Sequence, residues 1–163
     1  MRKGIKMKYK IREMKKQEYG MLETFIYEAI FQKDKDNPIP KSIIYEPEIF
    51  IYIDNFGTRK DDYCLCAEID NNLIGAVWVR NIKGFGNVDE STPEFAISVL
   101  KLYQGKGVGN ALMKEMLKRL KRKGYKEASL AVQKDNYAYN MYLNLGFQVI
   151  DENEEEYIMK ILL

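Results

Sequence analysis

The feature that most constrains this chain is a run of three glycines at alternate positions, Gly105, Gly107 and Gly109, where an apolar strand pattern gives way to a long amphipathic helix pattern. Glycine adopts backbone conformations that are closed to residues with a Cβ atom, so the N–H groups of such a turn can converge on one point. The helix that follows adds the positive end of its dipole. The sequence therefore predicts an anion site made of backbone, suited to a phosphate or pyrophosphate.

Two common phosphate-binding turns do not fit these residues. A P-loop requires Ser or Thr directly after Gly-Lys, whereas Gly107 follows Lys106. A dinucleotide-binding fingerprint that began at Gly105 would need Gly or Ala where Asn110 stands. The pattern that remains, Gln-x-x-Gly-x-Gly starting at Gln104, resembles the acyl-CoA-binding motif of the GNAT superfamily of N-acetyltransferases.

Composition and charge indicate one globular domain, residues 1–163. The chain is 46% hydrophobic and 31% charged, which is enough for a buried core, and no apolar run approaches the ~20 residues of a membrane span. The basic residues Lys3, Lys6 and Lys8 are not followed by the apolar run of a secretory signal, so we expect a frayed terminus and a cytoplasmic protein.

Charge gives no reason to expect nucleic acid as a partner. The 26 basic and 24 acidic residues nearly balance, so no global field recruits a polyanion. The cations within residues 118–126 fall in the last turns of a predicted helix, where they oppose the negative end of its dipole. We expect them to form a solvated face.

Residue types that are absent or isolated exclude other chemistries. The chain has no histidine, which excludes Ser-His-Asp and Cys-His catalysis and histidine-bearing zinc sites. The two cysteines, Cys64 and Cys66, share one face of a predicted strand, and two ligands without partners do not make a structural zinc site. We expect packing residues rather than nucleophiles, and no metal.

The spacing of apolar residues predicts a strand, two helices, three strands, a helix, a strand, a helix and two strands. The strands are predicted at residues 9–14, 63–69, 73–82, 95–100, 128–133, 147–150 and 157–162, and the helices at 16–32, 47–55, 108–123 and 136–145. A helix that connects the fourth and fifth strands requires a parallel pair. We therefore expect an α/β (α+β) fold: a mixed, mostly antiparallel sheet of six to seven strands with helices on both faces.

A second motif follows the first by about 30 residues and contains Asn136, Tyr142, Gly146 and Phe147. It resembles the C-terminal helix signature of the GNAT superfamily, although Asn136 stands six positions before Tyr142 where many members have seven. The order of predicted elements is also that of the GNAT fold, so the resemblance covers nearly the whole chain. It implies that strands four and five splay apart and that acetyl-CoA is the co-substrate.

The resemblance also assigns residues to the cofactor. The backbone of the glycine turn would hold the pyrophosphate, and backbone N–H groups near the end of strand four would face the thioester carbonyl as an oxyanion hole. The cofactor-binding residues implied in this way are Val99, Leu100, Gln104, Gly105, Lys106, Gly107, Val108, Gly109 and Asn136.

Two residues are candidates for handling protons, and direct transfer is expected because no covalent nucleophile is apparent. Tyr142 matches the tyrosine that gives a hydrogen bond or a proton to the leaving thiolate in this superfamily; its alternative role is a core position. Most alkyl amines are protonated at neutral pH, so a proton must be removed before attack. Glu94, at the start of strand four, is the candidate base, and an ordinary surface glutamate is its alternative.

The acceptor is expected to be the primary amine of a small molecule or a peptide. Its pocket could be built from aromatic and acidic residues that could equally fill the core: Tyr45, Glu46, Tyr52, Trp78 and Glu94. The resemblance also allows a homodimer. The alternative function is a non-catalytic CoA-binding or sensing module on the same fold.

Overall fold

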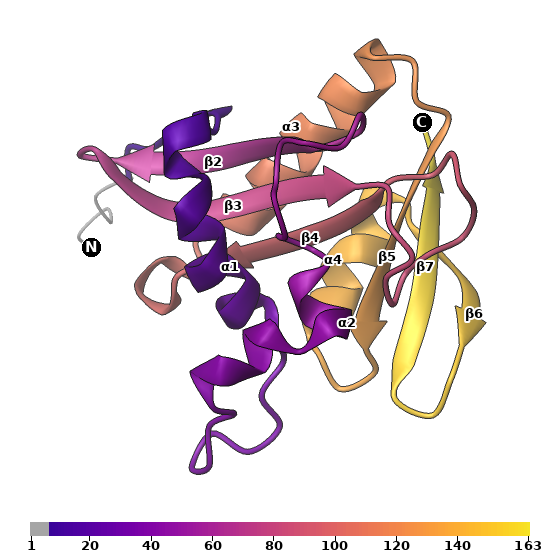
Figure 1. Cartoon of the computed structure of the whole chain (residues 1–163), viewed down its shortest axis with the longest axis horizontal. Coiled ribbons are helices and arrows are strands. Elements are labelled where there is room, and N and C mark those ends of the chain that lie inside the picture. Colours follow the sequence, from indigo (N-terminus) through magenta and orange to yellow (C-terminus); the bar gives the residue numbers. More distant parts are fainter. Residues whose placement is uncertain (1–6) are drawn as a thin grey trace, which may run out of the picture.

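The computed structural model describes residues 7–163, so the predicted frayed terminus at Lys3 and Lys6 lies outside the described residues. The strands form one sheet in the order β1-β2-β3-β4-β5-β7-β6 (Figure 1). They are β1 (Lys10–Glu13), β2 (Tyr63–Ile69), β3 (Asn72–Arg80), β4 (Glu94–Val99), β5 (Glu127–Gln133), β6 (Gln148–Glu152) and β7 (Glu156–Leu162).

The α-helices are α1 (Leu22–Ala29), α2 (Pro47–Phe50), α3 (Val108–Arg122) and α4 (Ala138–Leu145). Short 3-10 helices occupy Lys16–Met21, Lys41–Tyr45 and Lys101–Tyr103. No helix within residues 7–163 combines the length and the apolar character that a membrane span requires.

The parallel pair β4–β5 interrupts an otherwise antiparallel sheet. The two strands are in register at a single position, Glu94 opposite Ser129, and the Ser129 N–H donates to the Pro93 carbonyl at 3.0 Å. Beyond this point β4 and β5 are no longer paired. The predicted mixed sheet, with a splay between the fourth and fifth strands and helices on both faces, is confirmed.

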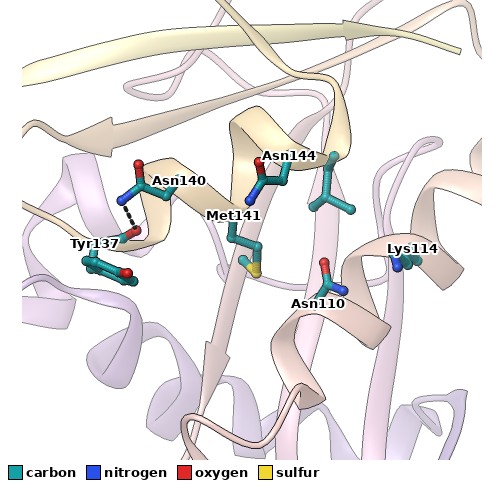
Figure 2. Close-up of a pocket in the computed structure, with 7 residues that line it drawn as sticks. Asn110, Lys114, Tyr137, Asn140, Met141 and Asn144 are labelled. Atoms are coloured by element: carbon teal, nitrogen blue, oxygen red, sulfur yellow. Dashed lines mark hydrogen bonds between the residues drawn. The ribbon is translucent and has the colours of Figure 1, made fainter.

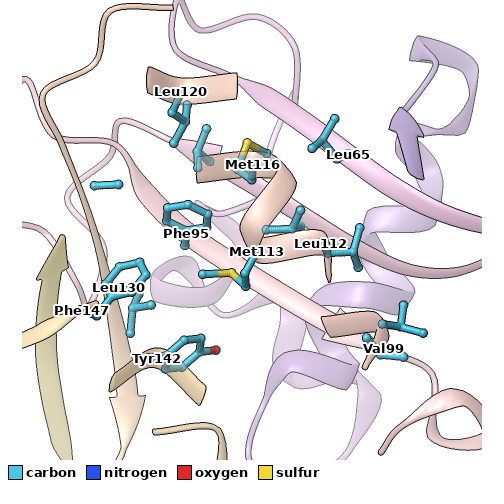
Figure 3. Packing of buried hydrophobic residues seen from close by; sticks show 14 of the residues in the cluster. Leu65, Phe95, Val99, Leu112, Met113, Met116, Leu120, Leu130, Tyr142 and Phe147 are labelled. Carbon is cyan, nitrogen blue, oxygen red and sulfur yellow. The ribbon is translucent and has the colours of Figure 1, made fainter. Parts of the chain in front are cut away.

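Helices α3 and α4 pack on one face of the sheet over its larger core. Apolar residues of α3 at helical spacing, such as Leu112, Met113 and Met116, lie against alternate residues of the strands, including Phe95 (Figure 3). All three of these α3 side chains are fully buried. The amphipathic pattern of the sequence therefore correctly predicts which side of α3 faces the sheet.

Helices α1 and α2 cover the opposite face over a second core, which contains Trp78, Cys64 and Cys66. The two cysteines are 1% and 0% exposed and form no disulfide. Burial raises the pKa of the Cys66 thiol to about 11, so this thiol stays protonated at neutral pH. The prediction that both cysteines are packing residues is confirmed.

The helix predicted over residues 16–32 is shorter in the structure. Its first six residues form a 3-10 helix, and α1 ends at Ala29. The reason is tertiary: the Tyr27 hydroxyl donates to the carbonyl of Ile39, and the Gln32 side chain bonds both to that hydroxyl and to the Ile39 N–H. These bonds hold the following loop against the helix end, and the helix cannot continue.

The helix predicted over residues 47–55 is also shorter in the structure, where α2 has four residues. The buried guanidinium of Arg80 donates to the carbonyls of Ile51 and Asp54 at 2.9 and 2.7 Å and to both carboxylate oxygens of Asp62 at 2.9 Å. Carbonyls that would serve a longer helix therefore bond to a side chain of β3. This cation fixes the segment after α2 to the sheet.

The basic stretch at the end of α3 packs against β2. Arg119 pairs with Glu115 at 3.0 Å and donates to the Tyr63 hydroxyl at 3.0 Å. The ammonium of Lys123 lies 4.2 Å from the centre of the Tyr63 ring. Part of the charge in residues 118–126 is thus engaged within the chain.

A pair of charged residues makes stability depend on pH. Arg12 donates to both carboxylate oxygens of Glu18 at 2.8 Å, and this pairing lowers the pKa of Glu18 from 4.5 to about 2. A carboxyl group with a depressed folded-state pKa stabilises the fold above its unfolded pKa and loses that contribution as the pH falls through the folded value.

We expect Glu18→Gln to reduce the loss of unfolding free energy between pH 4.5 and 2, measured by urea titration. Glu23→Gln, at an exposed position of α1, is the control; a wild-type slope in Glu18→Gln would contradict the prediction.

Candidate functional site

The glycine turn before α3 has the conformation that its sequence predicts. Gly105 and Gly107 have φ values of 73° and 84°, in the left-handed region that favours glycine. A Cβ atom built on either residue meets nothing within 4 Å. The glycines are therefore needed for the backbone path and not for lack of space, and the outer side of the turn is open to a ligand.

Backbone donors gather at this turn because α3 begins there. The first bond of the helical ladder runs from the Ala111 N–H to the Gly107 carbonyl at 3.0 Å. The N–H groups of Val108, Gly109 and Asn110 precede that bond and have no helical acceptor. Together with the helix dipole they can hold an anion without any cationic side chain.

Gly109 serves a different purpose from the other two glycines. A Cβ atom here would lie 3.7 Å from Val99 and 3.9 Å from the sulfur of Met141. The first turn of α3 thus lies close to the end of β4 and to α4. Three elements of the predicted site meet at this point.

The end of β4 directs part of its backbone into the splay. The Leu100 N–H donates to the Ile74 carbonyl of β3 at 2.8 Å. Because backbone groups alternate sides along a strand, those of Ile97 and Val99 point away from β3, toward β5. Of the two predicted oxyanion donors, only the Val99 N–H is open to the gap; that of Leu100 is used within the sheet.

Gln104 has a role that the sequence does not reveal. Its side-chain N–H donates to the Val99 carbonyl at 2.8 Å. This bond ties the glycine turn to the end of β4, on the side of the strand that faces the gap. Lys106 is exposed.

Tyr142 projects from α4 into the larger core. It is 7% exposed and meets Phe147 edge to face, with ring centres 6.0 Å apart. Its hydroxyl has no hydrogen-bond partner within residues 7–163, and Figure 3 shows it turned away from Phe147. Burial raises the pKa of Tyr142 to about 12, so the hydroxyl keeps its proton at neutral pH and is able to donate a hydrogen bond.

Asn136 begins the turn that leads into α4. Its side-chain oxygen accepts the Ala138 N–H at 2.9 Å and so closes an Asx turn just before α4. The side-chain NH₂ group makes no bond within the described residues and is the part that remains for a ligand.

A groove of about 370 Å³ separates α3 from α4 (Figure 2). Met141 points from α4 toward Asn110 on α3, and the exposed Tyr137 lies at one end. The lining residues are Asn110, Lys114, Tyr137, Asn140, Met141, Asn144 and Leu145. This groove is not among the features predicted from the sequence, although its three asparagines and one lysine on facing helix surfaces are a sign of a polar site.

Glu94 is buried on the opposite face of the sheet, under α2. It is 2% exposed, and its carboxylate accepts hydrogen bonds from the Tyr52 hydroxyl and from the N–H groups of Gly84 and Gly86, the last two at 3.1 Å. Burial raises the pKa of Glu94, while these bonds oppose the shift. Glu94 thus fixes the loop between β3 and β4.

The two loop glycines make that arrangement possible. A Cβ atom on Gly84 would lie 2.4 Å from the Tyr52 hydroxyl, and one on Gly86 would lie 2.6 Å from the backbone of Leu130 in β5. The sequence Gly-Phe-Gly at 84–86 marks this close approach.

The residues predicted to form the acceptor pocket do not converge. Trp78 is fully buried and its indole N–H donates to the Tyr52 carbonyl at 3.0 Å, so it belongs to the core. Tyr45 is 59% exposed and packs on Phe50, while Glu46 is exposed just before α2. Tyr52 contacts both Trp78, through its carbonyl, and Glu94, through its hydroxyl, but Tyr45 and Glu46 take no part in these bonds.

Among residues 7–163 no three acidic or cysteine side chains are placed to share a metal ion.

Known proteins that resemble this chain identify its family. A model of the acetyltransferase (GNAT) family matches residues 27–147. The chain belongs to this family. It is 32% identical over 108 residues to a [ribosomal protein bS18]-alanine N-acetyltransferase of Haemophilus influenzae, covering 63% of this chain and 70% of that protein. The predicted family and the N-acetyltransferase class are confirmed.

Solved structures of this family share the fold over nearly the whole chain. The PaiA N-acetyltransferase of Thermoplasma acidophilum, solved with coenzyme A, matches with a TM-score of 0.70 at 22% identity, covering 96% of this chain and all of that one. The ribosomal-protein-S18-alanine N-acetyltransferase of Escherichia coli matches with a TM-score of 0.66 at 16% identity, covering 95% and 94%. The general reaction of the family is acetyl transfer from acetyl-CoA.

The glycine turn gives a matched pair of substitutions. Gly107→Ala forces a Cβ into the left-handed region, which costs about 1–2 kcal/mol. Gly109→Ala places a better helix former at a non-strained position with ordinary contacts, worth about 1 kcal/mol at most in either direction. We expect urea unfolding of the free protein to show a loss for Gly107→Ala and none for Gly109→Ala. Equal losses would contradict the role given to φ at Gly107.

Glu94 gives a second prediction about stability. Gln at this position replaces one acceptor oxygen with an NH₂ group, so at least one of the three donors loses its partner. We expect Glu94→Gln to lower the unfolding free energy by about 1–3 kcal/mol, measured by urea titration. Glu90→Gln, at an exposed position of the same loop, should change it little; similar values for both variants would contradict the anchoring role.

Proposed function

We propose that this chain transfers an acetyl group from acetyl-CoA to a primary amine, by direct attack within a ternary complex. The observation that carries the proposal is the meeting of three features: the open glycine turn, the Val99 N–H in the splay, and α4 with Tyr142. Gly109 lies against both Val99 and Met141, the neighbour of Tyr142, so these features belong to one site.

The residues present suit CoA. The backbone from Gly105 to Gly109 would hold the pyrophosphate, and the open space over Gly105 and Gly107 leaves room for it. The groove between α3 and α4 would take the nucleotide end, because Lys114 offers a cation and Tyr137 an exposed ring. The free NH₂ of Asn136 would reach the arm between them.

The chain's own groups would then manage charge at the reacting centre. When bound, acetyl-CoA supplies the acetyl group as an activated thioester. The Val99 N–H would donate to the oxygen on which negative charge develops, in a fixed direction set by the sheet. An N–H already oriented by the strand costs no reorganisation when the charge appears.

Tyr142 would stabilise the departing sulfur by a hydrogen bond. The thiol has an ordinary pKa of about 8.5, well below the pKa of about 12 that burial gives Tyr142. Complete transfer of the tyrosine proton to a thiolate is therefore uphill, whereas donation of a hydrogen bond is not. The hydroxyl has no competing partner within residues 7–163.

Glu94 stays our candidate for accepting the amine proton, acting through the Tyr52 hydroxyl. Its carboxylate is buried and holds three donors, so an acceptor amine would reach it only by way of Tyr52. Burial raises the pKa of Glu94, which makes its carboxylate a better proton acceptor than an ordinary surface glutamate. Its contact with the loop gives it an anchoring role as well.

A peptide N-terminus and a small amine both remain acceptor classes under this proposal. The Haemophilus influenzae relative acts on an alanine of ribosomal protein bS18, which favours a peptide. The acidic residues of the hairpin between β6 and β7 favour a cationic amine. A non-catalytic CoA-binding module is the second candidate function, and the free Tyr142 hydroxyl argues against it.

Binding tests the proposal first. Acetyl-CoA and CoA should raise the Tm of the protein in a concentration-dependent way, while ATP and NAD at equal concentrations should not. Free-thiol formation from acetyl-CoA should then depend on an added amine. Preference for ATP or NAD would refute both candidate functions, and CoA binding without amine-dependent thiol release would support the non-catalytic module.

Tyr142→Phe separates catalysis from binding. We expect kcat to fall about 10- to 100-fold, the value of one hydrogen bond to a charged group, with the dissociation constant for CoA nearly unchanged. Tyr139→Phe, also on α4 but stacked on Tyr157, is the control and should keep wild-type turnover. An unchanged kcat in Tyr142→Phe would remove its role at the sulfur.

A further inference from the structure

The loop between β3 and β4 presents one exposed aromatic ring in a fixed position. Phe85 is 47% exposed, its N–H donates to the Tyr52 hydroxyl at 2.8 Å, and its ring stacks on that of Tyr52 with centres 6.3 Å apart. The N–H groups of Gly84 and Gly86 on either side donate to Glu94. Three consecutive backbone bonds therefore hold an apolar ring at the surface, where it adds little to the core.

This ring stands at the border of an open half of the sheet. α1 and α2 cover β2 to β4, and the core beneath them contains no residue of β5, β6 or β7 (Figure 1). Gly86 lies directly against the backbone of Leu130 and Ala131 in β5. Phe85 is thus placed beside the later part of β5, on the face that α1 and α2 leave uncovered.

Gln133 lies on that same face. The Ser129 hydroxyl donates to the Gly86 carbonyl at 2.7 Å, which shows that this side of β5 faces the loop. Side chains repeat every second residue along a strand, so Gln133 faces the same side. Its amide oxygen is shut off from solvent and has no hydrogen-bond partner in the described part of the chain.

Glu156 is the neighbour of Gln133 across the sheet. The two residues are register partners in β5 and β7, and register partners share a face. Among residues 7–163 no Lys or Arg pairs with the Glu156 carboxylate. Burial raises the pKa of Glu156, and its charge raises that of Glu94. A hydrogen bond with the Asn153 side chain opposes the rise in the pKa of Glu156. An amide oxygen without a partner and a carboxylate without a cationic partner thus lie on neighbouring strands.

Gln133 lies at the same height along the strands as the end of β4 that borders the gap. Because β4 and β5 run parallel from the pair Glu94–Ser129, four residues further along each strand bring Gln133 level with Ser98. Val99, whose N–H opens into the gap, is the next residue of β4. A molecule held at Gln133 and Glu156 therefore reaches the gap from the face opposite α3 and α4.

We propose that Phe85, Gln133 and Glu156 form the acceptor subsite, and that it takes an amine carrying a second positive charge. The carboxylate binds the distant ammonium, the amide accepts an N–H, and the ring packs on the alkyl chain or against a cation. The broad last torsion of glutamine lets the amide turn its oxygen toward an arriving donor. This inference rests on the proposed function.

The surrounding charge favours the same ligand. The hairpin between β6 and β7 carries the acidic residues Asp151, Glu152, Glu154, Glu155 and Glu156. Of these five residues, all of which the structure describes, only Glu152 has a cationic partner, Lys134 at 2.9 Å. A cationic acceptor is therefore attracted over a distance of about one Debye length, roughly 8 Å at physiological salt.

The test begins with CoA-saturated protein, so that a failure to bind CoA refutes the proposed function separately. Butylamine, 1,4-diaminobutane, spermidine and an alanine-initiated peptide without Lys or Arg are then titrated by calorimetry, and thiol release from acetyl-CoA is followed in parallel. We expect diaminobutane and spermidine to bind at least about 10-fold more tightly than butylamine or the peptide, as a charge-assisted contact requires.

Three variants assign the effect to residues. Glu156→Gln should weaken diaminobutane binding about 10- to 100-fold and leave CoA binding unchanged. Glu155→Gln, on the same hairpin, should leave diaminobutane binding nearly unchanged. Phe85→Ala should weaken every alkylamine. Gln133→Leu should weaken amine binding while raising the Tm of the free protein, because it removes a buried oxygen without a partner.

The proposal is overturned by any of four results with CoA bound. They are equal affinity for butylamine and diaminobutane, tighter binding of the alanine-initiated peptide than of diaminobutane, equal effects of Glu156→Gln and Glu155→Gln, or no amine binding at all. A loss of Tm in Gln133→Leu would show that Gln133 supports the fold and would remove it from the subsite.

Discussion

The structure depends on the failure of two neighbouring strands to stay paired. β4 and β5 share one register position, Glu94 opposite Ser129, and then diverge. Backbone groups that a sheet would normally satisfy, those of Ile97 and Val99, are left facing a gap. Unpaired strand edges inside a protein are costly unless something pairs with them. The gap therefore has an oriented backbone donor at one side and a helix N-terminus at its end, which is the arrangement that the proposed function uses.

The two strands beside the gap are held from both faces of the sheet. Helices α3 and α4 anchor the far ends of β4 and β5 from one face, where Leu112 and Met113 are fully buried. On the other face the loop between β3 and β4 is pinned to Glu94 at the last point where the strands are paired. At the end of β4, the Gln104 side chain donates a hydrogen bond to the Val99 carbonyl.

Two buried charged groups organise the face that α1 and α2 cover. Arg80 donates hydrogen bonds to Asp62 and to two backbone carbonyls after α2. Glu94 accepts hydrogen bonds from Tyr52 and from backbone N–H groups of the loop between β3 and β4. Each charge is satisfied by several partners, which is the condition for burying it. Two segments without regular structure are thereby bonded to the sheet, and the second of them, which includes Phe85, lies where we propose that the acceptor binds.

The sequence by itself determined the fold, the family and the glycine turn. These depend on local rules: the apolar period, the positive φ that Gly105 and Gly107 permit, and the spacing of Tyr142 from Gly146. Only the tertiary structure decided how far the helices before β2 extend, which strand N–H opens into the gap, and that Trp78 is core while Phe85 is exposed. Those outcomes depend on partners distant in the chain, such as Arg80 with Ile51 or Leu100 with Ile74. A sequence pattern reports the preferences of a residue, whereas the choice among its hydrogen-bond partners is made only when the chain has folded.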